Sequence, residues 1–191
     1  MNNLKNKKKY FLFNYIRINR RPSNQLMFYW LKKELKKNKN LPIALDVGCG
    51  KSINRPFFKN KFYIGVDFND KFISNAAQKY PSDTYMVINL SSEKLPKADM
   101  VVCTLVLNNK HYPVNKTIES VKNLVEAVKH KGELIFTLGN VNAPYIDKVE
   151  RLLNDSFSEV ESKTYGRFNE STYFSYILAM LMIIVPKLRL S

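Results

Sequence analysis

The chain has 191 residues, of which 45% are hydrophobic and 25% are charged, so it can bury the core of one domain and is not a largely disordered chain. Its two cysteines have neither disulfide-framework nor metal-ligand spacing, which excludes a disulfide-stapled secreted domain and a cysteine metal site and favours a reducing cytoplasm. The net charge of +15 is concentrated in residues 1–40, which hold 12 Lys/Arg and one acid and contribute +11 of it.

Residues 1–40 are interpreted as a basic N-terminal arm that leads into an amphipathic helix. Tyr and Phe alternate with Lys and Arg in the arm, and the helix is predicted to run from an N-cap at Ser23 to about Lys37. Such a segment would be attracted to RNA, to an anionic membrane surface or to a phosphorylated substrate, or would be an ordinary solvated surface. These alternatives stay open.

From residue 41 onward, short apolar runs alternate with helical patterns. The strands predicted in this way are 43–47, 62–67, 84–89, 98–106 and 132–139. The predicted helices run from a cap at Asn69 to about Lys79, over 115–130 and over 143–154. Because parallel strands need helical crossovers, this alternation favours an α/β fold with a Rossmann-like, doubly wound, mostly parallel sheet.

The C-terminal part predicts a different connection. Residues 157–166 and 171–180 read as two late strands joined by a short loop, so we expect an antiparallel hairpin strand at one edge of the sheet. We assign residues 41–182 to the domain and 183–191 to a short tail. The uncharged run 173–185 is too short to span a bilayer, which needs about 20 apolar residues.

The stretch LDVGCGKSINRPFF after the first strand contains two possible nucleotide signatures. A Walker loop needs a glycine five residues before the glycine of a Gly-Lys-Ser triplet, and that place holds Leu45. A dinucleotide fingerprint needs a third glycine where Ile53 stands, and Pro56 would cut short the helix that holds pyrophosphate. Neither a triphosphate nor a dinucleotide is therefore expected.

Two carboxylates frame the same loop. Asp46 precedes Gly48 and Gly50, and Asp67 ends the second predicted strand 19 residues after Gly48, the spacing expected of an acid that binds a ribose diol. A cofactor with a ribose but no phosphate suits this arrangement, and S-adenosylmethionine is one.

Five segments resemble, in order and spacing, the motifs of class I S-adenosylmethionine-dependent methyltransferases of the small, single-domain type 11 group. They are ALDVGCG, YIGVDFN, INLSSEKLP, ADMVVCTLVL and KGELIFTLGN, within residues 42–180. The resemblance implies a set of cofactor-binding positions: Asp46, Gly48, Cys49, Gly50, Asp67, Phe68, Asn89, Leu90, Thr104 and Leu105. No metal site is implied.

Within this resemblance, the glycine loop would cradle the methionine part of the cofactor, with Ser52 as its third small residue. Asp67 would bind the ribose hydroxyls and Phe68 would lie against the adenine. Asn89 or Leu90 would meet the adenine edge, although the family usually has an acid near this place. Thr104 and Leu105 would line the sulfonium side.

After the fourth strand the chain reads Asn-Asn-Lys-His where many relatives carry an acid-His pair. His111 is therefore the candidate general base, because imidazole titrates near neutral pH. We expect in-line methyl transfer to a small molecule or a sugar/glycan-type acceptor by a cytoplasmic protein, with peripheral membrane contact through the arm as one option. The alternatives are an RNA methyltransferase that uses residues 1–40, and a non-catalytic relative that only binds the cofactor.

Overall fold

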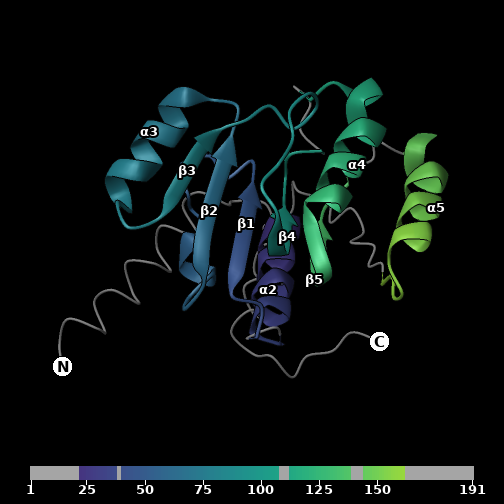
Figure 1. The fold of residues 1–191 in the computed structure, drawn as a ribbon, viewed down its shortest axis with the longest axis horizontal. Coiled ribbons are helices and arrows are strands. Elements are labelled where there is room, and N and C mark those ends of the chain that lie inside the picture. The colour runs from purple at the N-terminus through teal and green to yellow at the C-terminus, as the bar shows by residue number, and fades with distance from the viewer. Residues whose placement is uncertain (1–21, 38–39, 108–111, 139–143, 162–191) are drawn as a thin grey trace. The chain divides into compact units, whose positions relative to one another are not determined.

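The computed structural model describes residues 22–37, 40–107, 112–138 and 144–161 (Figure 1). Its elements are α2 (Pro22–Lys37), β1 (Ile43–Val47), η1 (Arg55–Phe57), β2 (Phe62–Asp67), α3 (Asp70–Lys79), β3 (Thr84–Val87), β4 (Ala98–Cys103), η2 (Val114–Lys116), α4 (Thr117–Ala127), β5 (Val128–Phe136) and α5 (Ile146–Ser156). The chain divides into two compact units: residues 38–161 form one, and α2 belongs to the other.

α2 is the expected amphipathic helix. Its buried side chains recur at helical spacing, namely Phe28, Leu31 and Leu35, while Lys33 and Lys36 are exposed. The helix begins at Pro22, where the missing N–H of proline costs no hydrogen bond, so Ser23 lies in the first turn instead of at the N-cap.

The unit of residues 38–161 is built on a five-stranded sheet with the order β3-β2-β1-β4-β5, parallel throughout (Figure 1). β1 lies at its centre, with Asp46 opposite Gly65 of β2 on one side and Val102 of β4 on the other. The buried, largely apolar runs of β1 and β4 suit a sheet covered on both faces. The Rossmann-like, doubly wound α/β fold expected from the sequence is thus confirmed.

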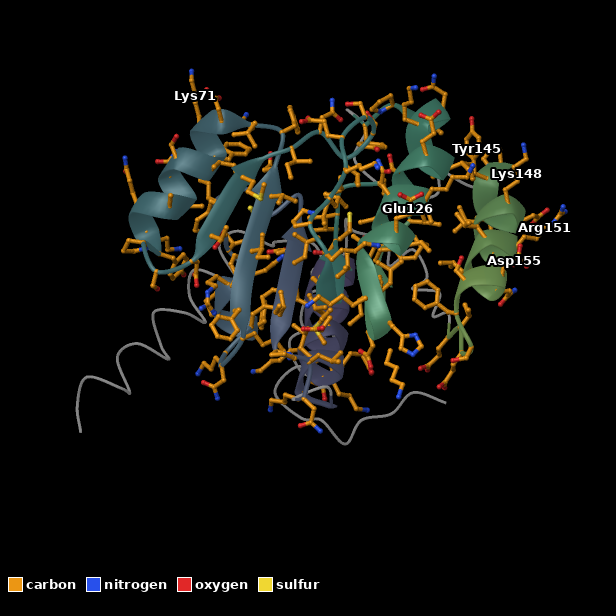
Figure 2. All side chains as sticks on the ribbon, in the orientation of Figure 1. Lys71, Glu126, Tyr145, Lys148, Arg151 and Asp155 are labelled. Carbon is orange, nitrogen blue, oxygen red and sulfur yellow. The ribbon has the colours of Figure 1, made fainter. Side chains whose placement is uncertain are left out.

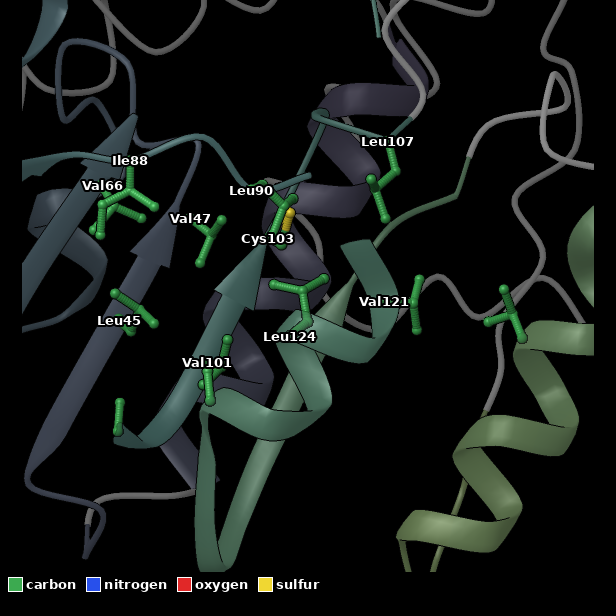
Figure 3. Close-up of a cluster of buried hydrophobic side chains, with 13 residues drawn as sticks. Leu45, Val47, Val66, Ile88, Leu90, Val101, Cys103, Leu107, Val121 and Leu124 are labelled. Carbon is green, nitrogen blue, oxygen red and sulfur yellow. The ribbon is translucent and has the colours of Figure 1, made fainter. Parts of the chain in front are cut away.

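The main core lies between the sheet and the pair α4–α5 (Figure 3). Leu45 and Val47 of β1 pack there with Val101 of β4 and with Val121 and Leu124 of α4. α5 places Val149 in this cluster, whereas its charged side chains Lys148, Arg151 and Asp155 are exposed (Figure 2). Burial of this one face, more than helix propensity, stabilises such short helices.

Helix α3 confirms the cap expected at Asn69. The Oδ1 atom of Asn69 accepts a hydrogen bond from the N–H of Phe72 at 3.2 Å, and Asp70 follows in the first turn. The helix therefore starts three residues after the last residue of β2. This fixes the geometry of the β2–α3 turn, which the site uses.

The segment after α4 differs from the expectation of a helix to residue 130. Helix α4 ends at Ala127, and Val128 already pairs with Ala98 as the first residue of β5. The chain then bulges before Glu133 pairs with Met100, with Lys131 at a φ of 62°. A Cβ atom on Gly132 would lie 2.6 Å from the Asp99 carbonyl oxygen, so only glycine fits there. Close packing against β4, which helical periodicity does not encode, ended the helix early.

Three strands also end earlier than predicted, among them β5, which stops at Phe136. β3 stops at Val87 because Asn89 opens a turn in which the N–H groups of Ser92 and Glu93 bond to its carbonyl oxygen. β4 stops at Cys103, and Leu105 turns the chain with a φ of 62°.

The expected antiparallel hairpin is not part of the described sheet. Residues 157–161 form no strand, and the rest of the two segments lies outside the described residues. The assignment of residues 162–182 to the domain therefore stays a prediction. Among the helices that the structure describes, none is long and apolar enough to cross a membrane.

Candidate cofactor site

The expected site residues gather at the carboxyl ends of β1, β2, β3 and β4. In a doubly wound sheet this edge binds ligands near the switch point, which lies here between β1 and β4, where the connections reverse direction. The short η1 replaces the long helix that would hold a pyrophosphate, as Pro56 indicated.

The loop after β1 is a tight turn held by backbone hydrogen bonds. The N–H groups of Gly48 and Cys49 both donate to the carbonyl oxygen of Val66, and Ser52 N–H donates to the carbonyl of Cys49. Gly48, Gly50 and Ser52 have φ values of 72°, 54° and 51°. The left-handed backbone explains the two glycines, and Ser52 occupies the third such position as a small, buried residue.

The two glycines have different reasons to lack a side chain. A Cβ atom on Gly48 would lie 2.1 Å from Cγ2 of Val106, so Gly48 allows the loop after β4 to pack against the loop after β1. A Cβ atom on Gly50 would have no neighbour within 4 Å. Gly50, more than Gly48, is therefore the place where a ligand can approach the loop backbone.

The Cys49 side chain packs inside the protein and does not face the side of the loop where a ligand could approach Gly50. Its thiol is buried, and burial raises the pKa of that thiol above its ordinary value. With its N–H and carbonyl also engaged in the turn, Cys49 has a packing role in this structure. Its expected contact with a cofactor stays a prediction.

Asp67 links the loop to the start of α3. Its Oδ2 accepts the Gly50 N–H at 2.9 Å, and its Oδ1 accepts the Asn69 N–H at 2.9 Å. Each carboxylate oxygen can accept a further hydrogen bond, so a ribose diol can still be bound. Phe68 follows with 74% of its surface exposed, which suits a ring that stacks on an adenine.

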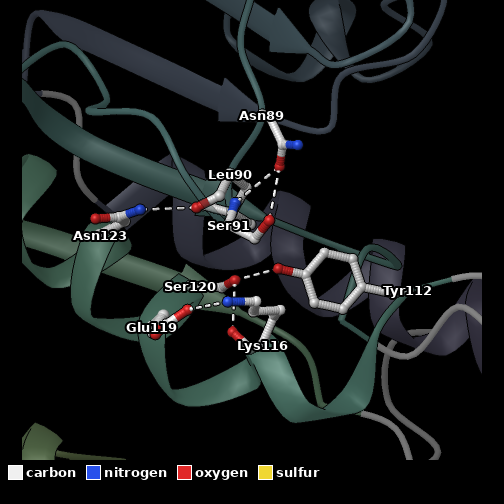
Figure 4. Close-up of polar contacts among 8 residues, drawn as sticks. All are labelled: Asn89, Leu90, Ser91, Tyr112, Lys116, Glu119, Ser120 and Asn123. Carbon is white, nitrogen blue, oxygen red and sulfur yellow. Dashed lines mark hydrogen bonds and ion pairs between the residues drawn. The ribbon is translucent and has the colours of Figure 1, made fainter.

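The loop after β3 is fixed by α4 (Figure 4). Asn89 Oδ1 accepts hydrogen bonds from the N–H and hydroxyl of Ser91, so its amide nitrogen is the better group to meet an adenine edge. The Leu90 side chain is buried in the core, and its carbonyl oxygen accepts from Asn123 at 2.8 Å. Leu90 can therefore meet a ligand only through its backbone.

The end of β4 reaches the same edge. The Thr104 hydroxyl accepts from the Asn54 amide at 3.5 Å, and the Leu105 N–H donates to the Thr137 hydroxyl at 2.9 Å. The Thr137 N–H in turn donates to the Cys103 carbonyl. Asn54 and Thr137 were not among the predicted site residues, because each acts through a contact distant in sequence.

Asp46 is the most unusual group of the site. It is 1% exposed, its Oδ2 accepts the Tyr63 hydroxyl at 2.7 Å, and its Oδ1 has no hydrogen-bond partner among the described residues. Burial raises the pKa of Asp46 to about 7, against the opposing effect of the Tyr63 and Asn54 side chains. A buried carboxylate oxygen without a partner is costly unless a ligand donates to it.

The candidate general base of the sequence analysis is His111. His111 falls outside the described residues, so its expected catalytic role stays a prediction. Its neighbour Tyr112 hydrogen-bonds to Ser120, whose hydroxyl also donates to the Lys116 carbonyl (Figure 4). Tyr112 thus anchors this loop to α4.

The chemical character of these groups suits the functional groups of S-adenosylmethionine. The unpartnered Asp46 Oδ1 suits an ammonium group, the open side of Gly50 suits a close backbone contact, and Asp67 suits a ribose diol. Among the described residues no cluster of His, Cys, Asp and Glu could hold a metal ion.

Comparison with known proteins supports the same family. Residues 45–136 match the family model described as a methyltransferase domain. No curated protein sequence matches the chain significantly.

Solved structures of methyltransferases share the fold. The N-methyltransferase NodS from Bradyrhizobium japonicum, solved with S-adenosyl-l-homocysteine, is similar over 81% of this chain and 85% of its own, with 15% identity and a TM-score of 0.62. Magnesium protoporphyrin IX methyltransferase from Synechocystis, solved with bound SAM, is similar over 76% and 75%, with 24% identity and a TM-score of 0.58. A TehB-like SAM-dependent methyltransferase from Corynebacterium glutamicum is similar over 58% and 64%, with 20% identity and a TM-score of 0.51. The chain thus spans less than two thirds of this last protein.

Proposed function

Because residues 45–136 are a class I S-adenosylmethionine-dependent methyltransferase domain, we propose that the chain methylates a small molecule or a sugar of a glycan. One observation carries the assignment of the site. The hydrogen bond from Gly50 N–H to Asp67 Oδ2 joins the glycine loop and the ribose-binding acid at one edge of the sheet. This contact supports the proposed cradle, because it holds the glycine loop beside the acid that we expect to bind the ribose.

Each part of the cradle has a proposed role. Asp46 Oδ1 accepts from the ammonium of the cofactor, Gly50 lets its backbone approach, and Asp67 binds the ribose hydroxyls. Phe68 stacks on the adenine, and Asn89 meets its edge. Asp46 and Asp67 also bring negative charge to a cofactor that carries a positive sulfonium.

When bound, the cofactor supplies a methyl group on an electrophilic sulfonium. The chain contributes orientation: Thr104 and Leu105, fixed by Asn54 and Thr137, line the side from which an acceptor approaches. Holding two reactants in line contributes roughly 7–11 kcal/mol to such a step. We propose that His111 accepts the proton of a hydroxyl acceptor.

The acceptor class rests on two supports. Between β1 and β5 the connections are short, with no inserted domain that would grip a macromolecule. The Synechocystis neighbour acts on magnesium protoporphyrin IX, a small molecule. Both favour a small acceptor over RNA.

Methyl-labelled S-adenosylmethionine tests this proposal. The protein is incubated with the label and with separate small-molecule, glycan-lipid and RNA fractions of a cell extract, beside a D67A control. Label in the first or second fraction, lost in D67A, is the expected result. If the label enters only the RNA fraction, the acceptor is RNA and not a small molecule or a glycan. If no label is transferred although the cofactor binds tightly, the chain is a non-catalytic relative.

The basic arm has a separate proposed role. We propose that residues 1–40 hold the protein at an anionic surface, since they carry most of its net positive charge. Co-sedimentation with vesicles that contain phosphatidylserine should fall on removal of residues 1–21 and with rising salt. If the deletion leaves sedimentation unchanged, the arm does not hold the protein at an anionic surface. If the arm binds RNA and not vesicles, its partner is RNA.

A further inference from the structure

Tyr63 is a buried tyrosine near the start of β2, and the first residue of the YIGVDFN segment, for which the family resemblance implied no role. Its hydroxyl donates to Asp46 Oδ2 at 2.7 Å and lies 3.4 Å from the Ser52 hydroxyl. It therefore reaches both the buried acid of β1 and the third small residue of the glycine loop.

The Tyr63 ring is held by aromatic and cationic neighbours. The ring centroids of Phe58 and Tyr85 lie 5.3 Å and 6.0 Å away, and the Arg55 guanidinium carbon lies 5.1 Å from the ring centroid. Arg55 is itself fixed by an ion pair with Asp83. These contacts limit the directions in which the hydroxyl can point.

Gly65 makes this arrangement possible. A Cβ atom on Gly65 would lie 2.7 Å from Cε1 of Tyr85. The Tyr85 ring therefore occupies the space that a side chain at position 65 would need. Tyr85 can then reach inward from the edge strand β3 to meet Tyr63 edge-on.

The hydrogen bond from Tyr63 determines which oxygen of Asp46 can receive a ligand. Because Oδ2 is engaged by Tyr63, Oδ1 is the oxygen left to receive a ligand, and it has no partner in the described part of the chain. This fixed hydrogen bond on Oδ2 also sets the rotation of the carboxylate about its χ angles.

We propose that Tyr63 is a positioning residue for cofactor binding: its hydroxyl orients the Asp46 carboxylate and stabilises the ionised form that receives the cofactor ammonium. This rests on the cofactor site described above. In this proposal the effect of Tyr63 is exerted through Asp46, to which its hydroxyl donates.

Cofactor affinity should then depend on pH. Among the described residues, the titratable or charged groups that act on Asp46 or on its Tyr63 partner are Tyr63, Tyr85, Asp67, Cys49, Cys103 and Arg55. Among those acting on Asp46, Asp67 opposes its ionisation and the Tyr63 hydroxyl favours it. With the pKa of Asp46 at about 7, the ionised fraction falls about tenfold from pH 8 to pH 6, and the apparent affinity falls with it.

The experiment is calorimetric binding of S-adenosylhomocysteine between pH 6 and pH 8. The wild type should bind about tenfold more weakly at pH 6 than at pH 8. Y63F removes one hydrogen bond to the carboxylate, which should raise its pKa by about one unit. Y63F should therefore bind about ninefold more weakly than the wild type at pH 6 and only about twofold more weakly at pH 8.

Two further variants are matched controls. Y85F removes a hydroxyl from the same aromatic cluster that does not bond to Asp46, and its pH profile should follow the wild type. D46N should bind weakly with a profile that shows only the titration of the ligand itself. If Y63F does not fold, 3,5-difluorotyrosine at position 63, a stronger donor of similar size, should instead tighten binding at pH 6.

The outcomes separate this proposal from the cofactor assignment. No binding by the wild type at any pH would overturn the cofactor assignment itself. Wild-type binding without pH dependence would overturn the proposal alone. A constant loss in Y63F at every pH, an equal shift in Y85F, or no tightening with difluorotyrosine would do the same.

Discussion

At the scale of single residues, the site combines groups that the fold tolerates at a cost. Asp46 is almost fully buried, and Gly48, Gly50 and Ser52 have left-handed backbones. Such features concentrate where a protein binds a ligand, because the ligand supplies the interactions that offset them. The first two predictions concern these residues.

Asp46 should make the free protein less stable as the pH rises. Its pKa is raised from 3.8 to about 7 on folding, so the neutral acid stabilises the fold fully below about pH 4 and this contribution is lost as the pH rises to 7. From pH 4 to pH 8 the wild type should lose up to about 4 kcal/mol relative to D46N. Urea unfolding at several pH values measures this difference, and parallel curves for the two proteins would contradict it.

The two glycines of the loop should respond differently to alanine. G48A combines a φ of 72° with a clash against Val106 and should lower the free energy of unfolding by about 2–4 kcal/mol. G50A adds a methyl group to open space at a φ of 54° and should cost only about 1 kcal/mol. G50A should nevertheless lose more cofactor affinity than its stability loss explains. Unfolding and binding titrations on both variants decide this, and equal stability losses would refute the distinction.

At the scale of elements, helices position the loops that carry the site. α3 begins at the turn that presents Asp67 and Phe68, and α4 holds the loop after β3 through Asn123 and the loop before η2 through Ser120 (Figure 4). At this edge, polar side chains of a core helix thus bond to the backbone of the loop after β3 and to the side chain of Tyr112.

The cap of α3 is the simplest of these devices to test. N69A removes the oxygen that accepts from Phe72 N–H and should lower the free energy of unfolding by about 1 kcal/mol. N75A changes the same residue type in the middle of the helix, where its side chain bonds to the Lys71 carbonyl, and should cost little or nothing. Urea unfolding compares them; an equal loss in both would mean that the cap contributes nothing particular.

At the scale of the whole molecule, cofactor binding couples to the stability of the sheet unit. The site draws on β1, β2, β3 and β4, so a ligand that binds there favours the folded state of all four strands. All four strands lie within residues 38–161, so we expect this coupling within that unit.

Thermal unfolding should show that S-adenosylhomocysteine stabilises the protein. S-adenosylhomocysteine at 100 times its Kd should add about 2.7 kcal/mol and raise Tm by about 5–10 °C. D67A, which loses the ribose acceptor and the bond to Gly50, should show little or no rise at the same ligand concentration. Scanning calorimetry measures both, and an equal rise in D67A would remove Asp67 from the cofactor site.

Much of the fold and part of the site were predictable because they rest on local patterns. Asn69 was recognised as a cap, Pro56 as the end of a shortened helix, and the strand runs as a parallel sheet, since each depends on neighbouring residues. The early start of β5 at Val128 was missed, because the bulge there depends on packing against Asp99 of another strand. Tyr63 was missed as well, although it shares the period-two face of β2 with Gly65 and Asp67.

The sequence by itself determined the class of cofactor: the spacing of Gly48, Gly50 and Asp67 needs no contact map, because a strand, a turn and a second strand bring them together. Tertiary structure alone decided how each residue acts. It showed that Gly48 makes room for Val106 whereas Gly50 faces open space, and that a tyrosine from β2 holds the buried acid of β1. The physical reason is that burial, and with it the ionisation of Asp46, depends on side chains distant in sequence that only folding brings into contact.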